Sequence, residues 1–172
     1  MRLSRVENIR AHRLFREALA DIEVLEKDRI YCRHGLEHLL DVARIGSIFV
    51  LEEGLGIPAD VIYAAALLHD LGRAEEYRSG EPHDEAGARI AAEILEDTDY
   101  TDEEKKMILA AVSEHRNKTA SGGEEGGAES EGELPLADVI RMADRLSRQC
   151  WACEAADTCK WPEEKKNKEI KI

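Results

Sequence analysis

The stretch that decides the fold reads Ala64-Ala65-Ala66-Leu67-Leu68-His69-Asp70-Leu71-Gly72. Its run of alanines and leucines is apolar in every direction, which predicts a helix buried on all sides. His69 and Asp70 follow at the end of this helix, and both are residue types that ligate metals. Burying them without partners would cost free energy. We therefore expect further polar or metal-ligating side chains to converge on them from the rest of the chain.

The composition favours an all-α fold. The chain has 172 residues, of which 43% are hydrophobic and only 5% aromatic, and Ala, Leu, Ile, Glu and Arg dominate. This length supports one domain with a sizeable core, so we expect a single helical domain over residues 1–172. The formal net charge of −13 argues against general binding to nucleic-acid backbones, which requires a basic surface. It does not exclude a single nucleotide or phosphate ester.

The sequence also carries expectations about compartment. No apolar run approaches the ~20 residues of a membrane span. The first residues, Met1-Arg2-Leu3-Ser4-Arg5, lead into a polar pattern rather than a secretory signal. We expect a cytoplasmic protein without a membrane partner, whose four cysteines are reduced thiols or metal ligands rather than disulfides.

Apolar residues that recur at spacings of three and four predict about six or seven helices. The first three cover residues 5–27, about 31–55 and 58–72, and Gly72 is expected to end the third of them. Three more begin near residues 83, 101 and 134, and a short charged helix covers residues 163–172. Residues 76–82 are expected as a loop. Residues 118–133 are expected as a flexible acidic loop, either a lid or a tolerated insertion, and residues 150–172 as a cysteine-containing tail.

Several ligand-type side chains fall on the apolar faces of these helices. Taken singly, such a histidine is most often a hydrogen-bonded core residue, and a buried aspartate such as Asp144 is most often half of a structural salt bridge. Together, imidazoles and carboxylates suit Fe, Mn, Zn, Co or Ni. The candidates come from five predicted helices: His38, His69, Asp70, His83, His115 and Asp144. So many ligands exceed the needs of one open catalytic ion and fit two ions roughly 3.5–4 Å apart, bridged by a carboxylate.

The ordered set of His38, the His69-Asp70 doublet and Asp144 resembles the HD superfamily of metal-dependent phosphohydrolases. The local context is similar too, in His38-Leu39-Leu40-Asp41-Val42-Ala43, in Leu67-Leu68-His69-Asp70-Leu71-Gly72 and in Met142-Ala143-Asp144-Arg145-Leu146. The resemblance covers about residues 30–150. It implies a single HD-type helical domain in which these four residues hold one metal ion.

Members of the superfamily with two metals add histidines between the doublet and the last aspartate, and His83 and His115 match that pattern. In this respect the chain looks like the diadenosine tetraphosphate hydrolases and the cyclic-dinucleotide phosphodiesterases. The Gly-Tyr-Pro signature of the latter is absent from the sequence. The single-metal nucleotidases carry a glutamate three residues after the doublet, where this chain has Arg73. The substrate branch therefore stays open.

The resemblance implies hydrolysis of a phosphate ester or anhydride by a metal-activated water, with Asp70 bridging two divalent transition-metal ions. The substrate would be a nucleotide or another small phosphorylated metabolite. Arg73, Arg116 and Arg145 are candidates to hold phosphate oxygens, because a guanidinium fork fits them, although each could instead form a surface salt bridge. His34, one turn before His38, is a candidate to orient His38 or the substrate.

Other interpretations stay open at the level of sequence. The same ligands would serve a di-iron oxygenase of the type resembling myo-inositol oxygenase, or a regulatory module that binds nucleotide or metal without turnover. A further metal or iron–sulfur site is a weaker possibility, since only one C-x2-C pair exists. Its thiols would be Cys32, Cys150, Cys153 and Cys159, with plain reduced thiols as the alternative.

Overall fold

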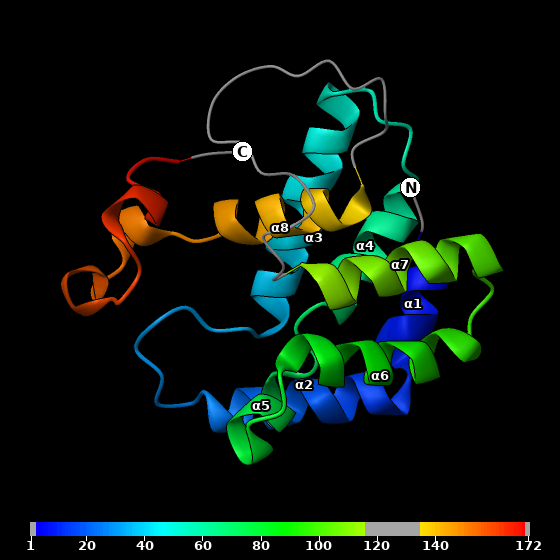
Figure 1. The fold of residues 1–172 in the computed structure, drawn as a ribbon, viewed down its shortest axis with the longest axis horizontal. Coiled ribbons are helices and arrows are strands. Elements are labelled where there is room, and N and C mark those ends of the chain that lie inside the picture. Colours follow the sequence, from blue (N-terminus) through cyan, green and yellow to red (C-terminus); the bar gives the residue numbers. More distant parts are fainter. Residues whose placement is uncertain (1–2, 116–134, 171–172) are drawn as a thin grey trace.

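The computed structural model describes residues 3–115 and 135–170. Within these residues the chain forms α-helices and short 3-10 helices but no strand, which confirms the all-α prediction (Figure 1). The α-helices are α1 Ser4–Ala11, α2 Arg13–Leu25, α3 Leu36–Glu52, α4 Ala59–Leu68, α5 Arg73–Ser79, α6 His83–Glu96, α7 Asp102–Glu114 and α8 Leu136–Leu146. The 3-10 helices are η1 Cys150–Ala152, η2 Ala156–Thr158 and η3 Glu163–Lys165.

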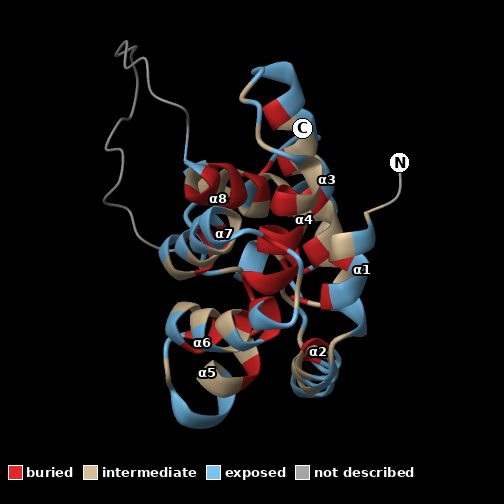
Figure 2. Cartoon of the chain, turned by 90° about the vertical axis from the view of Figure 1, so that its right-hand side faces the viewer, coloured by how far each residue is buried: buried red, intermediate tan, exposed pale blue. Residues whose placement is uncertain are grey.

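Helix α4 is the central element, as its apolar sequence predicts. Its residues from Ala64 to Leu68 are all buried, and α1, α3, α6, α7 and α8 pack around it. Buried residues accordingly gather on α4 and on the helices next to it (Figure 2). The alanines let neighbouring helices approach closely because they add little side-chain volume. The doublet that follows α4 therefore lies at the centre of the domain.

Gly72 brings α6 against this central turn. A Cβ at Gly72 would lie 2.1 Å from the carbonyl oxygen of His83 and 2.5 Å from the backbone nitrogen of Gly87, so only glycine allows the observed approach. Its φ is −75°, which any residue can adopt, so the requirement is steric rather than conformational. The close approach sets the first residue of α6, His83, directly beside the doublet.

Two predicted helix boundaries were wrong at the N-terminal end. The expected helix over residues 5–27 is divided into α1 and α2 by His12, whose extended backbone and ring nitrogen cap α2 by accepting the N–H of Leu14. The helix expected from about residue 31 begins only at Leu36. Contacts from His34 back to Glu26 hold the preceding segment outside the helix.

The boundaries around the doublet also differ from the prediction. The third helix ends at Leu68 instead of Gly72, so His69 and Asp70 lie in a tight turn. A short helix, α5, then covers most of the segment expected as a loop. Asp70 and Gly72 carbonyls start that helix by accepting from the N–H groups of Arg73, Glu75 and Glu76.

The C-terminal segment does not form the charged helix expected over residues 163–172. Its described part, up to residue 170, contains only the 3-10 turn η3. Instead the buried side-chain amide of Asn167 donates to the carbonyls of Arg145, Leu146 and Arg148, which α8 leaves unpaired at its C-terminal end. Satisfying these carbonyls holds the segment against α8, which is where Figure 1 shows it.

Two helix starts agree with the sequence prediction. Helix α6 starts at His83 as predicted, and α7 starts with a full capping box between Thr101 and Glu104. The expected acidic loop over residues 118–133 lies outside the described residues, and the extent of one domain over residues 1–172 stays a prediction. None of the helices in the described residues is long and apolar enough to cross a membrane.

Candidate metal centre

The structure brings the six candidate ligands together at the centre of the domain. They come from α3, from the turn after α4, from the start of α6, from the end of α7 and from α8. They form two groups whose ligand atoms all lie within 4.8 Å of one another. The first group contains His38, His69, Asp70 and Asp144, and the second contains Asp70, His83 and His115. Asp70 belongs to both groups.

The two carboxylate oxygens of Asp70 face different groups. Its Oδ2 lies 3.2 Å from Nε2 of His69 and 3.5 Å from Nε2 of His38. Its Oδ1 lies 3.3 Å from Nε2 of His83 and 3.9 Å from Nε2 of His115. Asp144 completes the first group, with Oδ1 at 3.4 Å from Nε2 of His38. This geometry suits a carboxylate that bridges two ions.

Backbone carbonyls orient two of the imidazoles. Nδ1 of His69 donates to the carbonyl of Ala66 at 2.7 Å, and Nδ1 of His115 donates to the carbonyl of Val112 at 2.6 Å. Both histidines cap the C-terminal end of a helix, where the last carbonyls lack helical partners. The proton on Nδ1 leaves Nε2 with a lone pair directed at the centre, which is the form that binds metal.

Side chains orient the other two imidazoles. Nδ1 of His83 lies 2.8 Å from Oε2 of Glu76, which fixes the ring by the carboxylate–histidine contact common beside metals. Nδ1 of His38 lies 3.3 Å from the hydroxyl of Ser147, a longer contact. Neither Glu76 nor Ser147 was singled out as a site residue from the sequence. Glu76 lies in the segment expected as a loop, and no motif marks Ser147 in the sequence.

Unpaired polar atoms indicate that the first group fits a metal ion. Nε2 of His38, Nε2 of His69 and Oδ2 of Asp70 are buried without a hydrogen-bond partner in the described part of the chain. Leaving such groups unsatisfied is costly, and a divalent cation would satisfy all three at once. The nitrogen and oxygen donors match the preferences of divalent transition metals. The residues present therefore fit the cofactor that the sequence predicts.

Local electrostatics favour metal-binding protonation states for Asp70, His83 and His115, whereas for His69 burial is outweighed by Asp70 and Asp144, which raise the pKa of that ring. Burial alone would raise the pKa of Asp70, but the charges of His69 and Arg73 hold it well below its usual range. Burial lowers the pKa of His83, and burial with the charge of His69 lowers the pKa of His115 to about 4. At neutral pH Asp70 is thus an anion, while His83 and His115 are neutral imidazoles. Metals bind these forms.

A buried acid beside the centre was missed by the sequence analysis. Glu26, at the end of α2, accepts from Nδ1 of His34 at 2.5 Å, from the backbone N–H of His34 at 2.7 Å and from the hydroxyl of Tyr77 at 2.5 Å. Burial opposes its ionisation, yet His34 and Tyr77 together lower the pKa of Glu26 to about 2. The His34 ring is thereby fixed next to His38, with ring centroids 5.6 Å apart. No motif marks Glu26 in the sequence.

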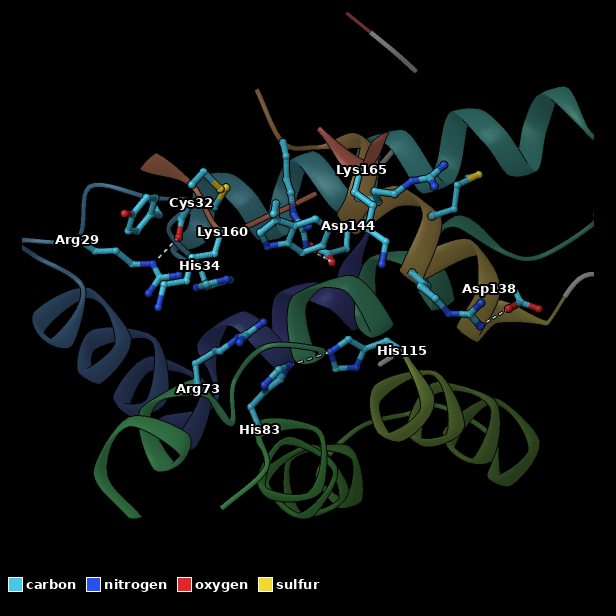
Figure 3. Close-up of a pocket in the computed structure, with 17 residues that line it drawn as sticks. Arg29, Cys32, His34, Arg73, His83, His115, Asp138, Asp144, Lys160 and Lys165 are labelled. Carbon is cyan, nitrogen blue, oxygen red and sulfur yellow. Dashed lines mark hydrogen bonds and ion pairs between the residues drawn. The ribbon is translucent and has the colours of Figure 1, made fainter. Parts of the chain in front are cut away.

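A cavity of about 760 Å³ opens beside the two groups. His83, His115, Asp144 and His34 line it, and Figure 3 shows Arg73, His83 and His115 across the cavity from Asp144, Lys160 and Lys165. Its wall carries seven cationic side chains but only two carboxylates, Asp138 and Asp144. The cations are Arg29, Arg73, Arg141, Arg145, Arg148, Lys160 and Lys165. A cavity of this charge favours an anionic ligand.

The predicted arginines have different positions. Arg73 lines the cavity, but its Nε donates to Oδ1 of Asp70 at 2.9 Å and its Nη1 donates to Glu76 at 3.2 Å. Arg145 lines the cavity near the end of α8. Arg116 lies outside the described residues. Arg73 is thus held by carboxylates of the centre, whereas Arg145 has no carboxylate partner in residues 3–115 and 135–170.

The four cysteines are free thiols in the region of the C-terminal segment. Cys32 is exposed and the other three are half-buried. Although the residue as a whole is exposed, partial desolvation of its thiol raises the pKa of Cys32; the charge of Arg148 lowers it, and Cys150, Cys153 and Cys159 raise it further. They are not among the groups of three or more ligand atoms within 4.8 Å of one another that the described residues contain. The structure thus places candidate metal ligands at the His/Asp centre rather than at these thiols.

The helices of this domain bring histidines and a shared aspartate together at one buried centre. This arrangement defines a class of helical metal-binding proteins. The chain belongs to the HD domain family, whose model matches residues 35–149. It is also 39% identical over 145 residues to an uncharacterised protein of Clostridium beijerinckii, and the match covers 84% of each chain.

One solved structure shares the fold. It is the crystal structure of a predicted HD superfamily hydrolase from an uncultured Thermotogales bacterium, with a TM-score of 0.62 and 21% sequence identity. The match covers 93% of this chain and 79% of the other. At this identity the likeness concerns the fold, so the arguments about chemistry rest on the residues of this chain.

Proposed function

We propose that this protein is a metal-dependent phosphohydrolase. It hydrolyses a phosphate ester or anhydride of a nucleotide or another small phosphorylated metabolite, using water at a two-metal centre. The observation that carries the proposal is the division of Asp70 between the two ligand groups, with Oδ2 facing His69 and Oδ1 facing His83. The cationic cavity beside the centre supports a phosphate-bearing substrate over an uncharged one. The family relation and the fold agree with a hydrolase.

His38, His69, Asp70 and Asp144 would hold one ion, and Asp70, His83 and His115 the other. When bound, the two ions lower the pKa of a shared water and neutralise charge that develops on the phosphoryl oxygens. The protein fixes the ligands in advance, through the carbonyls of Ala66 and Val112. Little reorganisation is then required when substrate binds.

Arg73 holds Asp70 in this scheme. Its Nε contacts Oδ1 of Asp70 and its Nη1 contacts Glu76, so one guanidinium links the shared carboxylate to the side chain that orients His83. The low pKa of Asp70 follows partly from this positive charge. We therefore assign Arg73 to positioning the second ligand group, in addition to lining the substrate cavity.

His34 supplies a proton donor for the leaving group. Its Nδ1 is held by the ionised Glu26, which leaves Nε2 as the ring nitrogen available to exchange a proton in the cavity that His34 lines. In the proposed reaction His34 passes a proton to the oxygen that departs from phosphorus, and solvent restores it afterwards.

The proposal is tested by coupling metal analysis to a substrate panel. Purified protein loaded in turn with Mn, Fe, Co, Ni or Zn is assayed against mono-, di- and cyclic nucleotides and sugar phosphates. We expect about two ions per chain and release of phosphate whose new oxygen comes from labelled water. Absence of turnover across the panel from metal-loaded protein contradicts the proposal, as does oxygen consumption in place of hydrolysis.

The role of His34 has its own test. With His34→Gln we expect turnover of alkyl phosphate esters to fall by about 10²-fold, because their leaving oxygen needs a proton. Nitrophenyl phosphate esters, whose leaving group departs without one, should change little. Equal losses for the two kinds of ester contradict proton donation by His34 and leave a purely structural role.

A further inference from the structure

The charge of the cavity is opposite to the charge of the protein. The chain carries a formal net charge of −13, yet cations on the cavity wall outnumber carboxylates by seven to two. A concave surface lined by one sign of charge focuses the electrostatic field and concentrates ligands of the opposite sign. The excess of cations is therefore local to this cavity, where it favours binding of an anion.

Three of the seven cations stand apart because the others have carboxylate neighbours. Arg73 contacts Asp70, Arg148 contacts Asp144, Arg141 contacts Asp138, and Arg29 lies at 4.0 Å from Glu26. The remaining cations have no carboxylate partner in the part of the chain that the structure describes. They are Arg145, Lys160 and Lys165, named here the tail triad.

The C-terminal segment is held so that Lys160 and Lys165 line the cavity together with Arg145 of α8. Asn167 ties the segment to the end of α8, and the hydroxyl of Tyr31 donates to the carbonyl of Thr158 at 3.2 Å. The guanidinium of Arg148 stacks over the Trp161 ring at 3.8 Å from its centroid, while its Nη2 contacts Asp144 at 2.8 Å. Figure 3 shows Lys160 and Lys165 on the Asp144 side of the cavity, opposite Arg73 and His83.

The tail triad is separate from the machinery that handles the reacting phosphate. The two ligand groups would hold the ions that bind that phosphate, and Arg73 contacts Asp70 and Glu76. Lys160 and Lys165 lie across the cavity from Arg73 and His83, and neither they nor Arg145 belongs to the two ligand groups. All three line the same cavity, and their charge suits a second anionic group of the same molecule, since a phosphate carries several acceptor oxygens for Lys and Arg donors.

We propose that the substrate carries a second phosphate group beyond the one that is hydrolysed, and that Arg145, Lys160 and Lys165 bind it. The inference rests on the proposed function, because it names the substrate class of that same site. Two chemistries meet the requirement: a linear oligophosphate, and a molecule with two separate phosphate esters. The C-terminal segment is then the determinant of substrate choice.

Binding to metal-free protein tests the site independently of catalysis. By calorimetry we expect tripolyphosphate to bind at least about tenfold more tightly than orthophosphate, since charge-assisted hydrogen bonds to a second phosphate each contribute measurably. The triple variant Arg145→Gln/Lys160→Gln/Lys165→Gln should lose that preference. Lys168→Gln is the matched control, because Lys168 lies in the same segment, is 70% exposed and does not line the cavity.

Kinetics on metal-loaded protein then identify the source of the second phosphate. Three substrates are compared. Adenosine monophosphate carries one phosphate, adenosine diphosphate carries a linear oligophosphate, and adenosine 3′,5′-bisphosphate carries two separate phosphate esters. In the triple variant we expect KM for the preferred two-phosphate substrate to rise at least about tenfold, with little change for the monophosphate. Circular dichroism verifies that the variant is folded.

The outcomes separate this inference from the proposed function. Equal affinity for orthophosphate and tripolyphosphate, or a preference that the triple variant retains, overturns the second-phosphate site while hydrolysis of monophosphates can stand. Loss of the preference in the triple variant, without any turnover of any phosphate compound, overturns the hydrolase and supports the site. Loss of the preference together with a selective rise in KM supports both.

Discussion

The two ligand groups share Asp70 but differ in what surrounds their atoms. The first group has a second carboxylate, Asp144, and buried ligand atoms of His38, His69 and Asp70 without hydrogen-bond partners in the described residues. The second group contains one carboxylate, Asp70, and the Asp70 oxygen that faces it already has a hydrogen-bond donor. Nε2 of His83 lies 3.1 Å from Nε2 of His115, and Oδ1 of Asp70 accepts from Arg73.

This difference leads us to infer that the two groups have unequal affinity for metal. An ion in the first group would be bound by two carboxylates and would give a partner to three buried polar atoms that lack one in the described residues. An ion in the second group would have only the shared carboxylate, whose Oδ1 also accepts the hydrogen bond from Arg73. The first group should therefore fill first as metal is added, and the second at higher concentration.

Asp70→Asn should have the largest effect, because it removes the charge that both groups share. We expect bound metal to fall from about two ions per chain to a small fraction, and kcat/KM to fall by about 10³-fold or more. Metal analysis after dialysis and kinetics with the best panel substrate measure the two effects. Asp28→Asn is the control, since the Asp28 carboxylate is 88% exposed and belongs to neither ligand group. Retention of both ions would contradict the bridging role.

His69→Ala and His115→Ala compare the groups directly. His69→Ala should leave neither ion firmly bound, because the tighter group is damaged. His115→Ala should keep about one ion per chain and lower kcat by about 10²-fold, since one ion of a pair is lost. Metal titration monitored by calorimetry measures the number of bound ions, and activity assays measure kcat. His12→Ala controls for loss of a histidine away from the centre, where His12 caps α2. Equal losses of bound metal in His69→Ala and His115→Ala would contradict the unequal metal affinity of the two groups.

The ligands of both groups could be predicted from the sequence because each stands on a strong periodic pattern. His38 repeats with Val42 on one helix face, and His115 follows Ala111 and Val112. All three of these apolar neighbours are buried in the structure. Where a helix has one apolar face, periodicity places a polar side chain on the inner side without knowledge of the partner elements. The all-α fold followed from the same patterns.

The supporting residues could not be predicted, because their roles depend on contacts between distant segments. Glu26 is one of many glutamates on the helices, and only the approach of His34 and Tyr77 makes it buried and ionised. The helix boundary errors have the same origin. Gly72 looks like a helix terminator in sequence, yet the packing of His83 and Gly87 against it is what requires a glycine. Local propensity contains no information on such approaches.

Glu76→Gln should weaken the second group selectively. Glu76 holds Nδ1 of His83 at 2.8 Å and contacts Arg73 at 3.2 Å, so its loss frees both. We expect a 10- to 100-fold weaker second metal-binding step, roughly the cost of removing an orienting carboxylate, with the first step unchanged. Calorimetric metal titration resolves the two steps. Glu75→Gln, at a more exposed position of the same helix where the side chain neighbours Arg78, is the control. A weaker first step would contradict the assignment of Glu76.

Glu26→Gln tests the support on the side of the first group, where Glu26 holds His34 beside His38. The pKa of Glu26 is lowered from its ordinary 4.5 to about 2, so its ionised form stabilises the fold. This contribution is complete above pH 4.5 and is lost as the pH falls towards 2, because the unfolded state takes up the proton first.

Denaturant unfolding of the metal-free protein measures this contribution. Glu26→Gln should be less stable than the natural chain by at most about 3 kcal/mol at pH 7, and the difference should shrink steadily between pH 4.5 and pH 3. Glu23→Gln, an exposed position on the same helix, should show no such change. A difference that stays constant from pH 7 to pH 3 would mean that Glu26 acts by packing rather than by charge. His34 would then lack the ionised partner that the proton-donor role requires.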